Sequence, residues 1–247
     1  MNDSVGGTPP VDPLDHPGEA HNHGDLDEQA NKIRAAVLGA NDGIVSTAGL
    51  VVGVAGATTS TAAIATAGIA GLVAGALSMG TGEYVSVSSQ RDTEEAAVAK
   101  ETKELAEDPE GEFNELIGLF EARGLSRETA TMVARELTDK DALAAHSREE
   151  LKIEPGHYVN PWAAAISSLA SFTVGALLPL AAILLIGADW RIPATFIAVA
   201  IALMITGYTS SRLAGSPTGR AVARNVVGGA LAMGVTYAVG SLLGTAI

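Results

Sequence analysis

The sequence predicts an all-α, polytopic membrane protein with five transmembrane helices and a small helical cytosolic domain inserted between spans two and three. First, five stretches are apolar for about 18 or more residues, long enough for a helix to cross a bilayer. Second, the 247-residue chain is 47% hydrophobic but only 4% aromatic and holds 28 glycines, which suits membrane helices that pack closely together. Third, most charged residues are confined to one segment between the second and third apolar stretches.

The chain divides into four parts. Residues 1–30 are rich in Asp, Pro, Gly and His and contain no Lys or Arg, so we expect a disordered acidic tail. Residues 31–90 hold the first two transmembrane helices, 91–160 form the inserted domain, and 161–247 hold the last three transmembrane helices. The predicted spans are 35–57, 62–88, 162–187, 192–211 and 222–246.

Local signals place several helix ends. The second span continues without a helix breaker until Pro109, and a helix of the insert ends at Gly124. Asn160 and Pro161 form a favourable cap and first residue for the third span, which Pro179 should kink. GxxxG spacing occurs twice in the first span, which makes that span the best candidate for tight packing or dimerisation.

Lys and Arg are distributed unevenly across the predicted membrane. Of the 15 basic residues, only Arg191 falls in a connection on the face opposite the insert. The others precede the first span or lie in the insert or in the 212–224 connection. Because basic loops stay in the cytosol, we expect the N-terminus, the insert and this connection to be cytosolic and the C-terminus extracytosolic.

Composition also excludes several functions. The formal net charge of −13 argues against binding to nucleic acid and against adhesion to anionic lipid, and it suits cationic ligands. The absence of cysteine excludes disulfides and thiolate metal sites. No phosphate-binding loop and no nucleophile with an adjacent base is found, so the sequence does not indicate an enzyme.

Two carboxylates lie inside the predicted spans, where no Lys or Arg could pair with them. Asp42 and Glu83 are each about eight residues from the cytosolic edge, or about 12 Å deep, and Met79 lies one turn from Glu83. An ionised group in the bilayer costs about 2.5–3.5 kcal/mol on insertion scales, so this arrangement predicts a bound proton or metal ion. A thioether from Met79 would favour softer transition metals, unless Met79 serves only in packing. The alternative is that both carboxyl groups are protonated, or that Glu83 reaches the interface.

The insert carries a second set of candidate ligands. Acidic side chains recur at helical spacing, which suits bridging or bidentate coordination of a metal ion. The alternative is a solvated acidic face without any ligand. The candidates are Glu101, Glu104, Glu112, Glu115, His146 and Glu150.

Two motifs resemble the vacuolar iron transporter family: GANDGIVSTAGLVVGV at residue 39, and AGLVAGALSMGTGEYVSVSSQRDTE at residue 70. The resemblance extends from about residue 31 to the end. It implies a dimer that moves Fe2+, and often Mn2+, out of the cytosol in exchange for protons, along a path at the subunit interface lined by the first spans. Asp42 and Met79 fall on the positions expected to handle the ion in the membrane, and Glu83 lies in the same motif.

The insert resembles the cytosolic metal-binding domain of that family. Glu101, Glu104, Glu112 and Glu115 fall on its glutamate ligands. His146 and Ser147 stand where two methionines can occur, ahead of Glu150. The thioethers of the family are absent there, and His146 is a candidate nitrogen ligand in their place.

Two functions compete. The leading hypothesis is a proton-coupled exporter of Fe2+ or Mn2+, acting as a homodimer and without a prosthetic group. The other is a membrane-anchored metal sensor or scaffold, which would have no use for Asp42. Abundant Ala and Gly with few Lys indicate a GC-rich bacterium and hence its plasma membrane, with a vacuolar membrane as the alternative.

Overall fold

The structure, a computed structural model, describes residues 23–156, 158–213 and 215–246. The described residues form seven α-helices and one π-helical turn, without any strand. Five of these helices are long and apolar enough to cross a membrane, as the sequence predicted. The elements are α1 (His23–Ala57), α2 (Thr61–Glu107), α3 (Pro109–Ala122), α4 (Arg127–His146), η1 (Ser147–Leu151), α5 (Pro161–Leu185), α6 (Arg191–Leu213) and α7 (Thr218–Ala246).

The predicted tail is shorter than expected. Helix α1 begins at His23, inside the segment 1–30 that composition assigned to the tail. The rest of that segment, residues 1–22, lies outside the described residues. At the other predicted helix starts the agreement is closer: Asn160 caps α5 through its side-chain oxygen, which accepts hydrogen bonds from the backbone N–H groups of Trp162 and Ala163.

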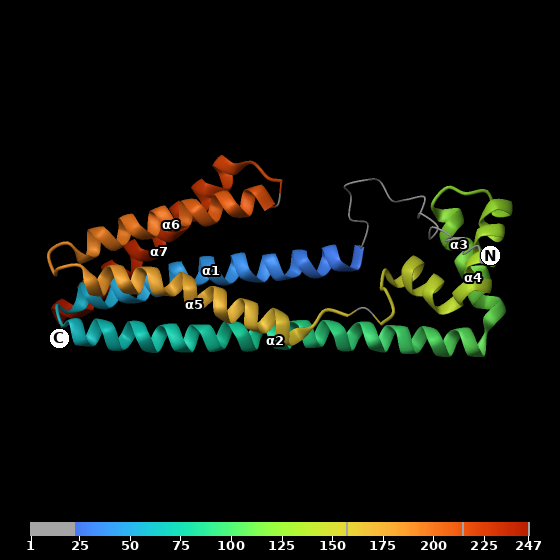
Figure 1. Cartoon of the computed structure of the whole chain (residues 1–247), viewed down its shortest axis with the longest axis horizontal. Coiled ribbons are helices and arrows are strands. Elements are labelled where there is room, and N and C mark those ends of the chain that lie inside the picture. Colours follow the sequence, from blue (N-terminus) through green and yellow to red (C-terminus); the bar gives the residue numbers. More distant parts are fainter. Residues whose placement is uncertain (1–22, 157, 214, 247) are drawn as a thin grey trace, which may run out of the picture.

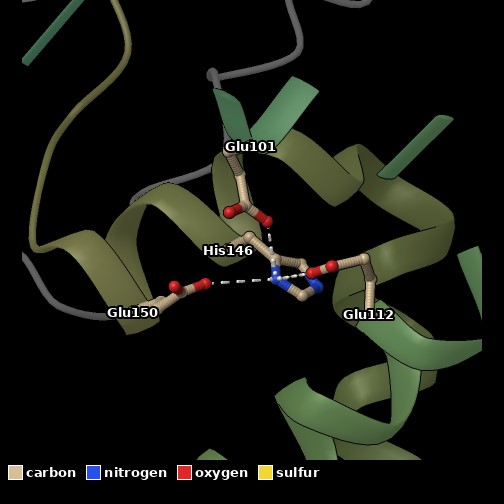
Figure 2. A group of neighbouring side chains, drawn as sticks. All are labelled: Glu101, Glu112, His146 and Glu150. Carbon is tan, nitrogen blue, oxygen red and sulfur yellow. Dashed lines mark ion pairs between the residues drawn. The ribbon is translucent and has the colours of Figure 1, made fainter. Parts of the chain in front are cut away.

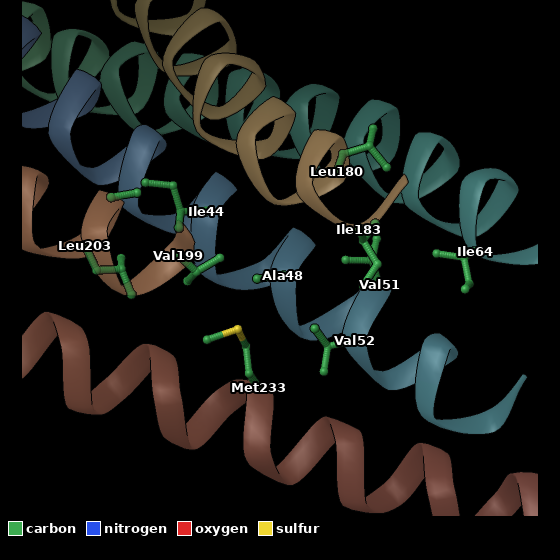
Figure 3. Packing of buried hydrophobic residues seen from close by; sticks show 11 residues of the cluster. Ile44, Ala48, Val51, Val52, Ile64, Leu180, Ile183, Val199, Leu203 and Met233 are labelled. Carbon is green, nitrogen blue, oxygen red and sulfur yellow. The ribbon is translucent and has the colours of Figure 1, made fainter. Parts of the chain in front are cut away.

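Helix α1 lies at the centre of the membrane bundle (Figure 1), where it contacts α2, α5, α6 and α7. Its residues Ala48, Val51 and Val52 are completely buried. Because lipid tails are as apolar as leucine, such a core stabilises the bundle mainly through close packing. Figure 3 shows the partners that surround α1 in this core: Ile64 from α2, Leu180 and Ile183 from α5, Val199 and Leu203 from α6, and Met233 from α7.

Glycines allow α1 to approach two neighbours at backbone distance. A Cβ atom on Gly43 would collide with the carbonyl group of Phe172 on α5, and one on Gly240 of α7 would collide with the carbonyl group of Gly53. The GxxxG pairs of the first span therefore serve tight packing within the chain. This packing fixes α1 between α5 and α7 and determines which of its faces remains available for function.

Helix α2 is continuous over 47 residues, about 70 Å at 1.5 Å per residue. Since a bilayer core is about 30 Å thick, α2 extends far beyond the apolar part of the bundle. The helical insert, which comprises α3, α4 and η1, lies at the far end of this extension (Figure 1). It has its own core, centred on Leu116, Phe120 and Ala130.

Candidate metal sites

Four polar side chains from four different elements converge in the helical insert (Figure 2). Glu101 comes from the extension of α2, Glu112 from the first turn of α3, His146 from the end of α4, and Glu150 from η1. We call these four residues the insert cluster. One ligand atom of each lies within 4.8 Å of the corresponding atom of every other member.

Local structure aims these groups at one point. Asp108 caps α3 by accepting a hydrogen bond from Gly111 N–H, which turns the chain so that the first turn of α3 returns toward α2. Glu150 follows His146 by four residues and lies in the π-helical turn, where its carboxylate is beside the imidazole. π-helical turns occur frequently at functional sites.

The imidazole of His146 lies at the centre of the insert cluster. Its Nδ1 atom is 2.9 Å from Glu101 Oε1, 3.5 Å from Glu112 Oε2 and 3.8 Å from Glu150 Oε2. The side chains of His146 and Glu101 are only 1% and 3% exposed. Even so, His146 Nδ1, Glu101 Oε1 and Glu150 Oε2 are buried without a hydrogen bond of normal geometry. Buried polar atoms are almost always satisfied, so these three atoms are suited to hold a cation between them.

Electrostatics agree with that interpretation. Burial, followed by the charges of Glu150 and Glu112, raises the pKa of Glu101 to about 7. Burial and the charge of Glu115 also raise the pKa of Glu112, although His146 opposes this. Carboxylates confined together repel one another until a proton or a metal ion neutralises them. Metal–ligand bonds of about 2.0–2.2 Å would place opposing ligand atoms about 4.2 Å apart, a spacing close to that of the insert cluster.

The other two predicted ligands of the insert lie outside the cluster. Glu104 forms an ion pair with Lys100 at 2.8 Å, and Glu115 is exposed on α3. Their charges still raise the pKa of Glu101. Sequence analysis missed Glu149, whose carboxylate pairs with Arg123 beside the cluster. Its position next to Glu150 was the only signal in the sequence.

Asp42 and Met79 line a common cavity in the membrane bundle. The cavity has a volume of about 200 Å³ and lies between α1 and α2, with Phe172 of α5 closing one side. It combines one carboxylate, one thioether and several hydroxyl groups, a mixed donor set that suits a transition metal better than Mg²⁺ or Ca²⁺. Sequence analysis did not single out three lining residues, Thr47, Ser78 and Phe172.

The remaining membrane candidates stand apart from this cavity. Glu83 is half-buried one turn beyond Met79 and does not line the cavity. Ser46 lines it, but its hydroxyl donates a hydrogen bond of 2.6 Å to the backbone carbonyl of Asp42. The side-chain oxygen of Asn41 is buried without a hydrogen bond and does not face the cavity.

The raised pKa of Glu101 predicts that the metal-free insert is less stable at high pH and that a bound metal restores its stability. In unfolded chains its pKa is near 4.5, so the folded state binds more protons between pH 4.5 and 7. The contribution of protonated Glu101 to the free energy of unfolding is therefore fully present below pH 4.5 and is lost as the pH rises through about 7. Amide hydrogen exchange in α3 and α4 of the metal-free protein should be faster at pH 8 than at pH 5.5, after correction for intrinsic rates. Adding Mn2+ at pH 8 should restore protection, since a metal requires the deprotonated ligand.

Glu101→Gln is the matched control for this pH prediction, because it removes the titrating group while keeping the shape. In that variant the pH dependence of exchange should be smaller. Unchanged pH dependence would assign the effect to another group.

Five membrane-length helices define an integral membrane protein, whose candidate cation sites are the carboxylate–thioether cavity and the buried carboxylate–imidazole cluster. Comparison with known proteins identifies its family. The sequence profile of the VIT family matches residues 33–241, and the chain belongs to that family. It is therefore a member of a transporter family and not an enzyme.

Several relatives cover most of the chain. A protein of Acanthamoeba castellanii named vacuolar iron transporter is 42% identical over 214 residues, 86% of this chain and 79% of the relative. Vacuolar iron transporter homolog 1 of Oryza sativa is 38% identical over 87% of this chain and 75% of the relative. Vacuolar iron transporter homolog 2 of Arabidopsis thaliana is 33% identical over 89% of this chain and 88% of the relative. The resemblance indicated by the two sequence motifs is thus confirmed.

Proposed function

We propose that this protein exports Fe2+, and also Mn2+, from the cytosol in exchange for protons. The observation that carries the proposal is the cavity between α1 and α2, where Asp42 and Met79 offer a titratable oxygen and a soft sulfur in the middle of the membrane bundle. A membrane-anchored sensor would need only the insert cluster, so this cavity favours transport.

In this proposal the insert is a cytosolic domain that captures metal before the membrane step. The insert cluster supplies three carboxylates and one imidazole, which suit divalent first-row metals. The sequence-predicted ligands Glu104 and Glu115 lie close enough to add negative charge, which would attract cations to the cluster.

We further propose that a homodimer completes the path. Apolar side chains of α1 at the cavity are exposed: Leu50, which lines it, is 39% exposed, and Leu38, one turn before Asp42, is 50% exposed. A second copy would cover them and enclose the cavity away from lipid. The chain has no cysteine, so a single Leu38→Cys variant can test this by crosslinking between copies in native membranes.

Uptake into proteoliposomes tests the transport proposal. Vesicles with the insert facing outward should accumulate Fe2+ or Mn2+ faster when their lumen is more acidic than the medium. With the membrane potential clamped at zero, the steady-state ratio of metal inside to metal outside should rise about tenfold per pH unit for each proton exchanged. Metal binding without uptake at any gradient would instead support the sensor.

Orientation provides a separate prediction. Five spans place the two termini on opposite sides, and in Figure 1 the C-terminal end of α7 lies at the opposite end of the molecule from the insert. With the basic loops cytosolic, a tag after Ile247 should be extracytosolic and a tag near Gly124 cytosolic. Protease protection in intact cells or spheroplasts measures both positions. The reverse result for either tag would overturn the orientation and the direction of transport.

A further inference from the structure

A second cavity lies between α6 and α7, lined by a set of residues separate from both candidate metal sites. Its volume is about 270 Å³, and every residue that lines it is apolar, among them Phe196 and Ile197 on α6 and Ala230 and Met233 on α7. Ile197 is 63% exposed and Ala230 is also exposed, so the cavity opens on the outer surface of the bundle. At this depth the surroundings are lipid acyl chains.

The cavity ends toward the predicted cytosolic side, where the two helices meet. A Cβ atom on Gly207 of α6 would crowd the backbone of Ala221 and Val222 on α7, which shows how closely the helices approach there. The first cavity-lining residue of α7, Val226, follows Arg224 by only two residues. One end of the cavity is therefore near the basic end of this helix pair.

Three arginines occupy that end: Arg212 in the last turn of α6, and Arg220 and Arg224 in the first two turns of α7. All three are exposed, and in the described part of the chain none forms an ion pair with a carboxylate. No Asp or Glu follows Asp189 in the sequence, so α6 and α7 carry only positive charge although the whole chain carries −13. Locally, these helices are complementary to an anion.

We propose that α6 and α7 bind an anionic phospholipid of the cytosolic leaflet. One acyl chain fills the cavity, and the phosphate is held by Arg220 and Arg224, which lie one turn apart on one face of α7. Guanidinium groups pair well with phosphate, and basic sites between membrane helices on the cytosolic side recognise anionic headgroups. The positive-inside rule accounts for the arginines but not for an apolar cavity beside them.

Lipid retention by the full-length protein tests this proposal. Protein depleted of lipid in neutral detergent would be mixed with dioleoyl phosphatidylglycerol or dioleoyl phosphatidylcholine, and bound lipid counted by native mass spectrometry. We expect one tightly bound phosphatidylglycerol per chain and much weaker binding of phosphatidylcholine. At about fivefold per arginine, Arg220→Gln/Arg224→Gln should weaken phosphatidylglycerol binding about 25-fold. Ala230→Phe, which keeps every charge but fills the cavity, should also remove the tight site.

The matched control is Arg135→Gln/Lys140→Gln, which removes two exposed charges from α4 and should leave binding unchanged. Equal retention of the two lipids, or full retention after the Arg220 and Arg224 changes, would overturn the proposal. So would normal binding by Ala230→Phe, because the arginines would then attract lipid without the cavity. Displacement by inorganic phosphate at the same concentration as the lipid would show a simple anion site and would also overturn it.

Discussion

Asp42→Asn should abolish metal flux and metal-driven proton movement together, while the protein still inserts and assembles. In the proposed mechanism, ionised Asp42 would neutralise a cation in the cavity that it shares with Met79. Protonated Asp42 would be tolerated in the membrane without the metal, so alternation between the two forms would couple metal export to proton entry. An amide keeps the shape of the side chain but cannot titrate, and it costs less in lipid than a carboxylate.

The measurement is metal influx and internal pH in the same proteoliposomes. Asp42→Glu is the matched control, because it keeps the titrating group with one extra methylene and should retain part of both signals. Ser46→Ala removes a neighbouring hydroxyl that lines the cavity and donates to the backbone of Asp42, and it should retain more of both signals than Asp42→Asn. Normal flux and coupling in Asp42→Asn would reduce Asp42 to a packing residue and end this mechanism.

Glu101→Gln/His146→Ala should produce the largest loss of metal binding in the insert. These two residues are the most buried members of the insert cluster and lie 2.9 Å apart, so removing them eliminates two adjacent ligands. Loss of a group that merely supports a ligand costs about 10–100-fold in affinity, and loss of two ligands should cost at least that much. Transport should slow without stopping, because capture precedes the membrane step.

Calorimetry with Mn2+ in the Asp42→Asn background measures this effect, since that background isolates the insert from the membrane cavity. Glu128→Gln/Glu136→Gln changes two exposed carboxylates on α4 and should leave binding intact. Glu104→Gln/Glu115→Gln should have an intermediate effect, because these charges act on the cluster without belonging to it. Equal losses in all three double variants would mean that only the net negative charge of the insert matters.

The membrane helices were predictable because their signal is local. Each span can be recognised by its length and hydropathy, and a capping residue such as Asn160 bonds to backbone N–H groups within one turn. All four members of the insert cluster were also among the predicted candidates, because residues three or four apart share a helix face. The same reasoning paired Asp42 with Met79, since residues at matched depth on antiparallel helices can meet.

Long-range packing determined what the sequence could not reveal. Nothing local distinguishes Glu101, which is buried beside His146, from Glu104, which turns toward Lys100. The π-helical turn at 147–151 has no obvious sequence signature either. Phe172 reaches the membrane cavity from α5, which is far from α1 and α2 in the sequence. Only the glycine contacts of α1 explain why α5 lies beside the cavity.

The continuous helix α2 carries a residue of each candidate site, with Met79 at the membrane cavity and Glu101 at the insert cluster. The 22 positions between them correspond to about 33 Å along the helix axis. Ions in solution screen exposed charges beyond about 8–10 Å, so the direct electrostatic effect of a metal at one site on the other is small at this distance. In the proposed mechanism, communication between capture and translocation would therefore run through movement of the helix. Tilting or rotation of α2 on metal binding to the insert cluster would then change the position of Met79 in the membrane cavity.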